Sequence, residues 1–111
     1  MDYIPRKIKF KAWDKENKLL MRLNSIQCNK GELFKKNHIL LQFSGFTDHE
    51  GEELYEMDVV FIDYKKFVIC WQNGWFYAPI ENIDSLEVLV KAKTESMRRF
   101  CSYFELEGQP V

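Results

Sequence analysis

An acidic loop between two apolar segments is the densest group of chemically active side chains in this sequence. Asp48, His49, Glu50, Glu52 and Glu53 place four carboxylates and one imidazole within six positions. Carboxylate oxygens from one loop can bind a hard cation, and two carboxyl groups with different pKa values in one cleft could catalyse hydrolysis. However, the spacing does not match an EF-hand loop, and a solvated turn explains the same residues. We therefore predict no metal ligand and no catalytic residue here.

The three cysteines and two histidines raise the question of a zinc site or a nucleophilic pair. They are Cys28, Cys70, Cys101, His38 and His49, and they are widely separated along the chain. Structural zinc sites nearly always contain at least one close pair of ligands, and a Cys–His nucleophile needs a third, orienting group. An odd, scattered set also gives no disulfide framework. We expect reduced thiols in a cytosolic protein, and no cofactor.

Asp58 directly precedes an apolar segment, where its carboxylate can accept hydrogen bonds from the backbone of a tight turn. We favour this structural role over a catalytic one, because Asp readily satisfies local backbone donors. Trp13 and Asp14 end another alternating segment. An aromatic residue in that position more often fills the end of a barrel than binds a ligand.

Short basic clusters form a candidate surface for nucleic acid or another partner. Its residues are Lys7, Lys9, Lys11, Trp13, Arg98 and Arg99. The three lysines share one face of a predicted strand with the tryptophan, as on surfaces that bind single strands. The competing explanation is an exposed strand edge whose charges oppose aggregation. The net charge of -1, from 16 basic and 17 acidic residues, favours the second explanation.

Length and composition indicate one globular domain over residues 1–111. The chain of 111 residues is long enough to bury a core. Its 46% hydrophobic and 15% aromatic content is typical of a folded protein rather than a disordered one. The N-terminus lacks the apolar core of a signal peptide, and no segment approaches the roughly 20 apolar residues of a membrane helix. We expect a cytoplasmic protein with no membrane partner.

Alternation of apolar and polar residues predicts strands along most of the chain. The predicted strands cover residues 6–13, 18–23, 38–44, 58–64 and 86–93. Asn17 is the expected left-handed residue of a turn after Trp13, and Gly51 that of the acidic loop. Lys65–Lys66 is predicted to form a tight charged turn.

Asn73–Gly74 lies between two apolar segments and is the clearest local signal. Both residues tolerate the positive φ of a type I′ turn, which predicts a hairpin with a two-residue loop. In that register Trp71 faces Phe76. Pro79 should end the pairing because it lacks a backbone donor.

The C-terminal segment has two interpretations. Met97, Phe100, Cys101 and Phe104 lie at helical spacing, and Thr94 could cap such a helix over 94–104. The alternative is a strand over 101–106. We expect the tail, residues 107–111, to be frayed. The sequence thus predicts a mostly-β fold with a possible C-terminal helix.

Three segments, in this order, resemble the YopX-like proteins of bacteriophages and prophages. They are IKFKAWDKENK (8–18), LLQFSGFTDHEGEELYEMDVV (40–60) and the aromatic Asn-Gly hairpin (67–80). These motifs are specific as a set and weak singly. The structural signature residues are Trp13, Asp14, Gly45, Asp48, Gly51, Tyr55, Asp58 and Gly74.

The chain departs from the family pattern in two places. Met57 stands where the family has glycine between Glu and Asp, and a positive φ there would cost a non-glycine residue about 1 kcal/mol. Residues 93–111 also continue beyond the usual end of the family pattern.

The resemblance implies a small, partly open SH3-like barrel that begins at Asp58, with an N-terminal β-hairpin extension. It also implies a tendency to self-associate, and it implies no activity. We therefore expect a non-enzymatic binding module that forms a homo-oligomer in the bacterial host cytoplasm, with an unknown protein partner. A small-barrel nucleic-acid-binding protein is the alternative, and a small carboxylate-dependent hydrolase is the second alternative.

Overall fold

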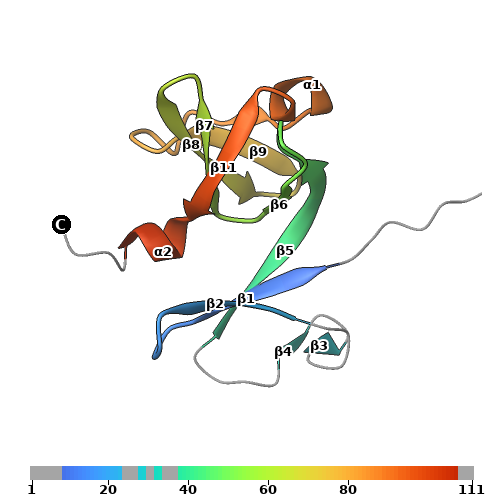
Figure 1. Ribbon diagram of the computed structural model, residues 1–111, viewed down its shortest axis with the longest axis vertical. Helices are drawn as coiled ribbons and strands as arrows, with labels where there is room; N and C mark the ends of the chain where they lie inside the picture. Colours follow the sequence, from blue (N-terminus) through green and yellow to red (C-terminus); the bar gives the residue numbers. More distant parts are fainter. Residues whose placement is uncertain (1–8, 24–27, 30–31, 34–37, 108–111) are drawn as a thin grey trace, which may run out of the picture.

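The computed structural model describes residues 9–23, 28–29, 32–33 and 38–107, and two β-sheets make up most of this part of the chain. One long strand, β5, runs from the lower sheet to the upper one (Figure 1). The mostly-β class predicted from the alternating segments is confirmed. Neither helix in these ranges has the length and apolar character needed to cross a membrane.

The N-terminal sheet has the strand order β2-β1-β5-β6. Its strands are β1 (Phe10–Asp14), β2 (Leu19–Arg22), β5 (His38–Thr47) and β6 (Glu53–Tyr55). The predicted N-terminal hairpin is confirmed, with Lys11 opposite Arg22. However, β1 is a central strand, paired with β5 on its other side, so Lys11 does not line a sheet edge. A separate short pair, β3 (Cys28–Asn29) and β4 (Glu32–Leu33), precedes β5.

The second sheet is a curled half-barrel of five antiparallel strands in the order β10-β9-β8-β7-β11. The strands are β7 (Asp58–Ile62), β8 (Lys65–Trp71), β9 (Trp75–Pro79), β10 (Glu87–Val88) and β11 (Met97–Ser102). The core lies on its inner face and contains Leu54, Val60, Ile69, Tyr77, Leu89 and Met97. The partly open SH3-like barrel that begins at Asp58 is thus present, beside the N-terminal hairpin extension (Figure 1).

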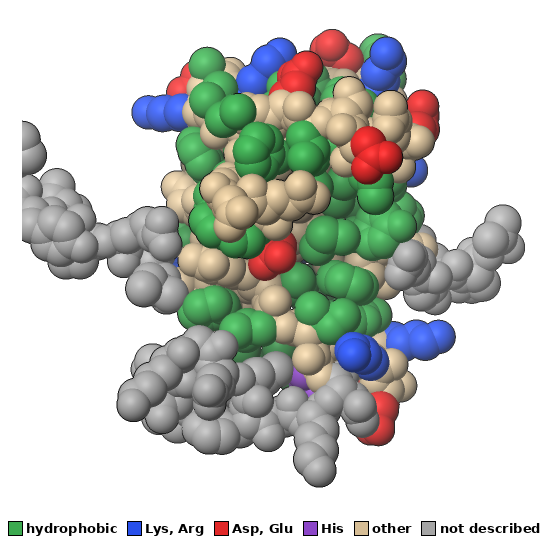
Figure 2. Space-filling view, turned by 180° about the vertical axis from the view of Figure 1, so that it is seen from behind, with side chains coloured by type: hydrophobic (Ala, Val, Ile, Leu, Met, Phe, Trp, Pro, Cys, Tyr) green, Lys and Arg blue, Asp and Glu red, His purple; other side chains and the backbone are tan. Residues whose placement is uncertain are grey.

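The outer face of the half-barrel is also largely apolar. Residues opposite one another in antiparallel strands point to the same face, which places Val59, Val68 and Ala78 together at its centre, all buried. Towards the β10 edge, Phe76 is half-buried and Val88 is 62% exposed. Hydrophobic side chains reach the surface over much of the back of the molecule (Figure 2).

The Asn-Gly hairpin forms where predicted, but its register is shifted by one residue. Trp71 pairs with Trp75 rather than Phe76, so the loop holds three residues instead of two. Asn73 has the expected positive φ of 55°, whereas Gly74 has φ 157° and lies outside the left-handed helical region of a type I′ turn. The aromatic cross-strand pair is therefore Trp71–Trp75, with ring centroids 5.1 Å apart. Pro79 ends β9 as predicted.

Two turn predictions were displaced by one or two residues. The turn between β7 and β8 is formed by Asp63 and Tyr64, with Asp63 at φ 56°, and Lys65–Lys66 belong to β8. In the β1–β2 turn the left-handed residue is Lys18 (φ 54°) rather than Asn17. The Asn17 side chain instead donates a hydrogen bond to Asp14, and this bond holds its backbone in the turn.

The predicted strand 86–93 is mostly wrong. Within it, β10 is the paired strand, and residues Lys91–Thr94 form the short helix α1. The ladder stops at Leu89, whose backbone N–H donates to the carbonyl of Trp75, because Trp75 is the first residue of the partner strand β9. Thr94 is buried at the end of α1, where its hydroxyl donates to the carbonyl of Lys91, so it is not an N-terminal cap.

A short C-terminal helix is present as α2 (Tyr103–Glu107), but the predicted bounds of 94–104 are wrong, since Met97–Ser102 form the strand β11. The competing strand prediction, 101–106, overlaps β11 by two residues. A β-bulge between Arg99 and Cys101 is the physical reason. It inserts one residue into the alternation, so the apolar residues acquire a spacing that resembles a helix. The tail predicted to be frayed, 107–111, begins with Glu107, which is the last residue of α2; its other residues, 108–111, lie outside the described residues.

Candidate functional site

The acidic loop is a structural connection and not a cluster of free carboxylates. Asp48 is buried, and its Oδ1 accepts hydrogen bonds from the backbone N–H groups of Glu50 (2.8 Å) and Glu52 (2.9 Å). Gly51 supplies the predicted positive φ, 85°. Glu50 and Glu52 are exposed, whereas Glu53 pairs with Lys9, which lowers the pKa of Glu53. Within the described ranges, this arrangement forms no pair of carboxylates in a shared cleft.

The same loop closes the open side of the barrel. Asp48 Oδ2 accepts a hydrogen bond from the backbone N–H of Arg99 at 2.7 Å, and His49 N–H donates to the carbonyl of Met97 at 2.8 Å. Both bonds fall on β11, which is an edge strand paired only with β7. Asp48 therefore attaches the end of β5 to the free edge of β11 and protects that edge from pairing with another chain.

Asp58 has the structural role predicted for it. Its carboxylate is 1% exposed and accepts hydrogen bonds from the backbone N–H of Tyr55 (2.9 Å) and from Nε of Arg99 (2.9 Å). Burial raises the pKa of Asp58, although the Arg99 guanidinium opposes that shift. The tight turn between Tyr55 and Asp58 places Met57 at φ 66°, so the position where the resemblance predicts glycine does take the left-handed conformation.

The lysine of β1, Lys11, is buried, whereas the side chain of Lys9, directly before β1, is 42% exposed and pairs with Glu53. Lys11 is 7% exposed, with its ammonium 4.4 Å above the Tyr55 ring, and burial lowers its pKa. Trp13 is 7% exposed and stacks on Phe104 of α2 with ring centroids 6.0 Å apart, so it packs the N-terminal sheet against α2. Lys7 lies outside the described residues. Lys11 and Trp13 therefore offer no exposed surface for a nucleic acid.

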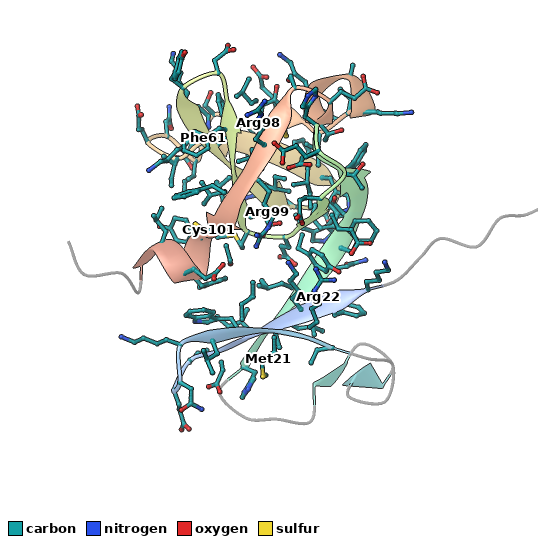
Figure 3. The ribbon with its side chains drawn as sticks, viewed as in Figure 1. Met21, Arg22, Phe61, Arg98, Arg99 and Cys101 are labelled. Atoms are coloured by element: carbon teal, nitrogen blue, oxygen red, sulfur yellow. The ribbon has the colours of Figure 1, made fainter. Side chains whose placement is uncertain are left out.

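The two C-terminal arginines differ in their surroundings. Arg99 is on the inner face, bonded to Asp58, with Nη2 3.9 Å from Glu105. Arg98 is on the outer face, its side chain is 67% exposed, and Glu50 lies 3.9 Å away. Figure 3 shows Arg99 and Arg22 on the sides of the two sheets that face each other, with Arg98 higher on β11. The candidate residues within the described ranges thus do not form one surface.

Charged side chains of both sheets lie near one another at the junction between the sheets. Arg99 and Asp58 lie on the barrel side and Lys11 and Arg22 on the N-terminal sheet, and Arg99 and Arg22 both act to lower the pKa of Lys11. Asp58 opposes that shift. A buried carboxylate among several cations compensates their charge, but removing it would leave unpaired buried charge. The arrangement supports architecture rather than catalysis.

The thiols and imidazoles do not converge on a metal. Within the described ranges, no group of three Cys, His, Asp or Glu side chains could hold an ion. Cys70 and Cys101 are partly buried free thiols, and burial raises the pKa of both. The Cys28 side chain lies outside the described residues, whereas His49 bonds to the backbone carbonyl of Glu95.

Exposed hydrophobic residues gather at both edges of the half-barrel sheet. On the β10 side and the adjoining hairpin they are Trp71, Ile83, Val88 and Val90, each between 44% and 62% exposed. At the β11 side, Phe100 is 46% exposed and its ring lies 5.3 Å from that of Phe61. Sequence reasoning missed this second group because Phe100 was assigned to a helix. The only signal for it was the basic–aromatic pattern from Arg98 to Phe100.

Comparison with known proteins supports the fold and gives no activity. The crystal structure of protein EF1440 from Enterococcus faecalis is similar, with a TM-score of 0.69 over 94% of this chain and 98% of that one. The two sequences are 14% identical, so the likeness concerns the fold alone. No protein-family model matches the chain, and a search of curated proteins found no match.

Proposed function

We propose that this chain is a YopX-like protein of phage or prophage origin that acts in the host cytoplasm as a non-enzymatic, self-associating binding module. The roles of the signature residues support the family proposal. Asp48 and Asp58 shape two tight turns through backbone hydrogen bonds, and Gly45 and Gly51 occupy positive φ. Such positions tolerate few other residues, which is the behaviour expected of a family signature.

The observation that carries self-association is the exposed apolar group at the β10 edge, consisting of Ile83, Val88 and Val90. Val88 is 62% exposed and lies on a strand whose only partner in the sheet is β9. Burying each such side chain contributes roughly 1.5–3 kcal/mol when it is completely removed from water. Exposed apolar side chains at a sheet edge are suited to pack against the same side chains of a second copy around a twofold axis.

Sedimentation velocity over a range of protein concentrations tests this proposal. Val88→Lys places a charge within the apolar group and should shift the protein from dimer to monomer. Leu19→Lys is the matched control, because Leu19 is similarly exposed (57%) but lies on β2 of the other sheet. A wild-type protein that stays monomeric at high concentration would rule out self-association. Equal effects of both variants would rule out the β10 edge as the interface.

A further inference from the structure

The opposite edge of the half-barrel carries an aromatic–basic surface, which we define as Phe61, Tyr64, Lys66, Arg98 and Phe100. The strand register brings it together, since Arg98 on β11 lies opposite Phe61 on β7, which lies opposite Lys66 on β8. All three therefore point to the outer face. Figure 3 shows Phe61 and Arg98 close together on the upper part of the barrel.

The aromatic rings of this surface are accessible, and a positively charged ammonium lies next to two of them. Tyr64 is 98% exposed and Phe100 is 46% exposed. The Lys66 ammonium lies 5.9 Å from the Phe61 ring centroid and 5.4 Å from that of Phe100. A cation at these distances is attracted to the ring faces, so Lys66 is positioned between the two rings and remains available to an anion.

A hollow of about 300 Å³ lies beside these rings. Its lining residues are Phe61, Asp63, Tyr64, Ser96 and Arg98. The lining thus combines aromatic faces with a guanidinium, a hydroxyl and a carboxylate. Glu50 is 62% exposed and lies 3.9 Å from Arg98. Exposed ion pairs of this kind contribute little to stability, so Glu50 competes only weakly with a bound anion for Arg98.

We propose that the aromatic–basic surface binds single-stranded nucleic acid, with bases stacked on Tyr64 and Phe100 and phosphates bound by Lys66 and Arg98. An unpaired strand exposes planar base faces next to regularly spaced negative charges, and this surface offers the complement of both. Asp63 and Ser96 can hydrogen-bond the polar edge of a base in the hollow. A duplex fits this surface less well because its base faces are hidden in the stack. An apolar peptide also fits less well, because it would remove the two cations from water without offering them a negative charge.

This inference rests on the proposed function only in treating the chain as a binding module. The two surfaces lie at opposite edges of the five-stranded sheet. Nucleic-acid binding and self-association can therefore be lost separately.

Fluorescence anisotropy with labelled 15-mers of dT and rU, at about 50 mM salt where phosphate contacts are strong, tests the proposal. Phe100→Ala should raise the Kd by about 5- to 100-fold, the usual range for loss of one stacked base. Arg98→Ala and Lys66→Ala should each reduce the slope of log K against log salt by about 0.7. Comparing the two oligomers shows whether DNA or RNA is preferred.

The matched controls are Leu19→Ala and Lys93→Ala, which remove an exposed apolar side chain and an exposed charge outside the surface. Both should bind as the wild type does. Tyr64→Ala gives a second test of stacking at a fully exposed position, where unfolding is not a concern.

Three results would overturn the proposal. They are absence of binding to both oligomers, equal weakening by the control variants, and equally tight binding of a 15-bp duplex. A poly-glutamate peptide bound with the same dependence on Phe100 would instead indicate an acidic protein partner. Sedimentation of the same samples shows whether self-association persists, so the failure of this proposal is distinguishable from the failure of the proposed function.

Discussion

The hydrogen bonds of Asp48 should make this residue the main connection between the acidic loop and β11. Its two carboxylate oxygens accept three backbone N–H groups, from Glu50, Glu52 and Arg99. We expect Asp48→Asn to be destabilising although it preserves size and shape. An amide has one oxygen, so in either orientation its NH2 group faces a backbone donor that the carboxylate satisfied.

The magnitude follows from the burial of each donor. A hydrogen bond to a charged group is worth about 1.5–3 kcal/mol. Glu50 and Glu52 are exposed, so water can replace most of the hydrogen bonding that their N–H groups lose when the carboxylate is removed. The Arg99 N–H lies on a half-buried residue of β11 and has less access to water. We therefore expect Asp48→Ala to lower the free energy of unfolding by about 2–4 kcal/mol and Asp48→Asn to cause at least half of that loss.

Urea and thermal unfolding measure this loss, which corresponds to a fall in Tm of about 4 °C or more per kcal/mol for a domain of this size. Glu52→Gln is the matched control in the same loop and should stay within about 0.5 kcal/mol of wild type. Hydrogen exchange measures the local effect, because the Arg99 amide should lose its protection from exchange in both Asp48 variants. An Asp48→Asn protein with wild-type stability and a protected Arg99 amide would refute the role of Asp48 in closing the barrel.

Two further predictions concern single positions. Met57 has φ 66°, where glycine avoids the cost of a Cβ, so Met57→Gly should be more stable than Met57→Ala by about 1 kcal/mol in urea unfolding. The reverse order would show that this turn is unstrained. Lys9 lowers the pKa of Glu53, so their pair stabilises the fold above the unfolded-state pKa of about 4.3 and is lost as pH falls through the folded-state value. The difference in unfolding free energy between wild type and Glu53→Gln, roughly 0.2–1 kcal/mol at pH 7, should therefore shrink towards pH 3. A difference that is the same at both pH values would contradict the assignment.

Local patterns in the sequence predicted those features that short-range chemistry determines. The Asn73–Gly74 hairpin, the turn that precedes Asp58 and the positive φ of Gly51 all depend on residues within a few positions of one another. Even there, the hairpin register was wrong by one residue, because turn type and loop length together set the register. The Asn-Gly dipeptide is compatible with a two-residue loop and with a three-residue loop, and the sequence alone does not distinguish them.

Features that depend on distant residues were not predictable in this way. Lys11 looks like a surface residue in an alternating strand, and only the fold places the Tyr55 ring under its ammonium. Likewise, the acidic loop reads as solvated because nothing near Asp48 in the sequence reveals that the Arg99 amide is 2.7 Å from its carboxylate. These contacts join residues 44 and 51 positions apart, beyond the range of any local pattern.

The bulge in β11 connects the main error in the sequence prediction with the proposed binding surface. Because one residue is inserted between Arg99 and Cys101, the strand changes phase there, and Ser102 faces inwards opposite Asp58 while Cys101 lies opposite Val59 on the outer face. Arg98, Phe100 and Cys101 can then all point outwards, whereas Met97, Arg99 and Ser102 point to the core and the junction. In the sequence, this uneven spacing of apolar residues resembles the spacing of a helix.

In the fold, the same spacing keeps Arg99 bonded to Asp58 and leaves Arg98 and Phe100 beside Phe61. The bulge therefore lies between the Arg99–Asp58 contact and the aromatic–basic surface, and this position matches the tendency of bulges to occur beside functional sites.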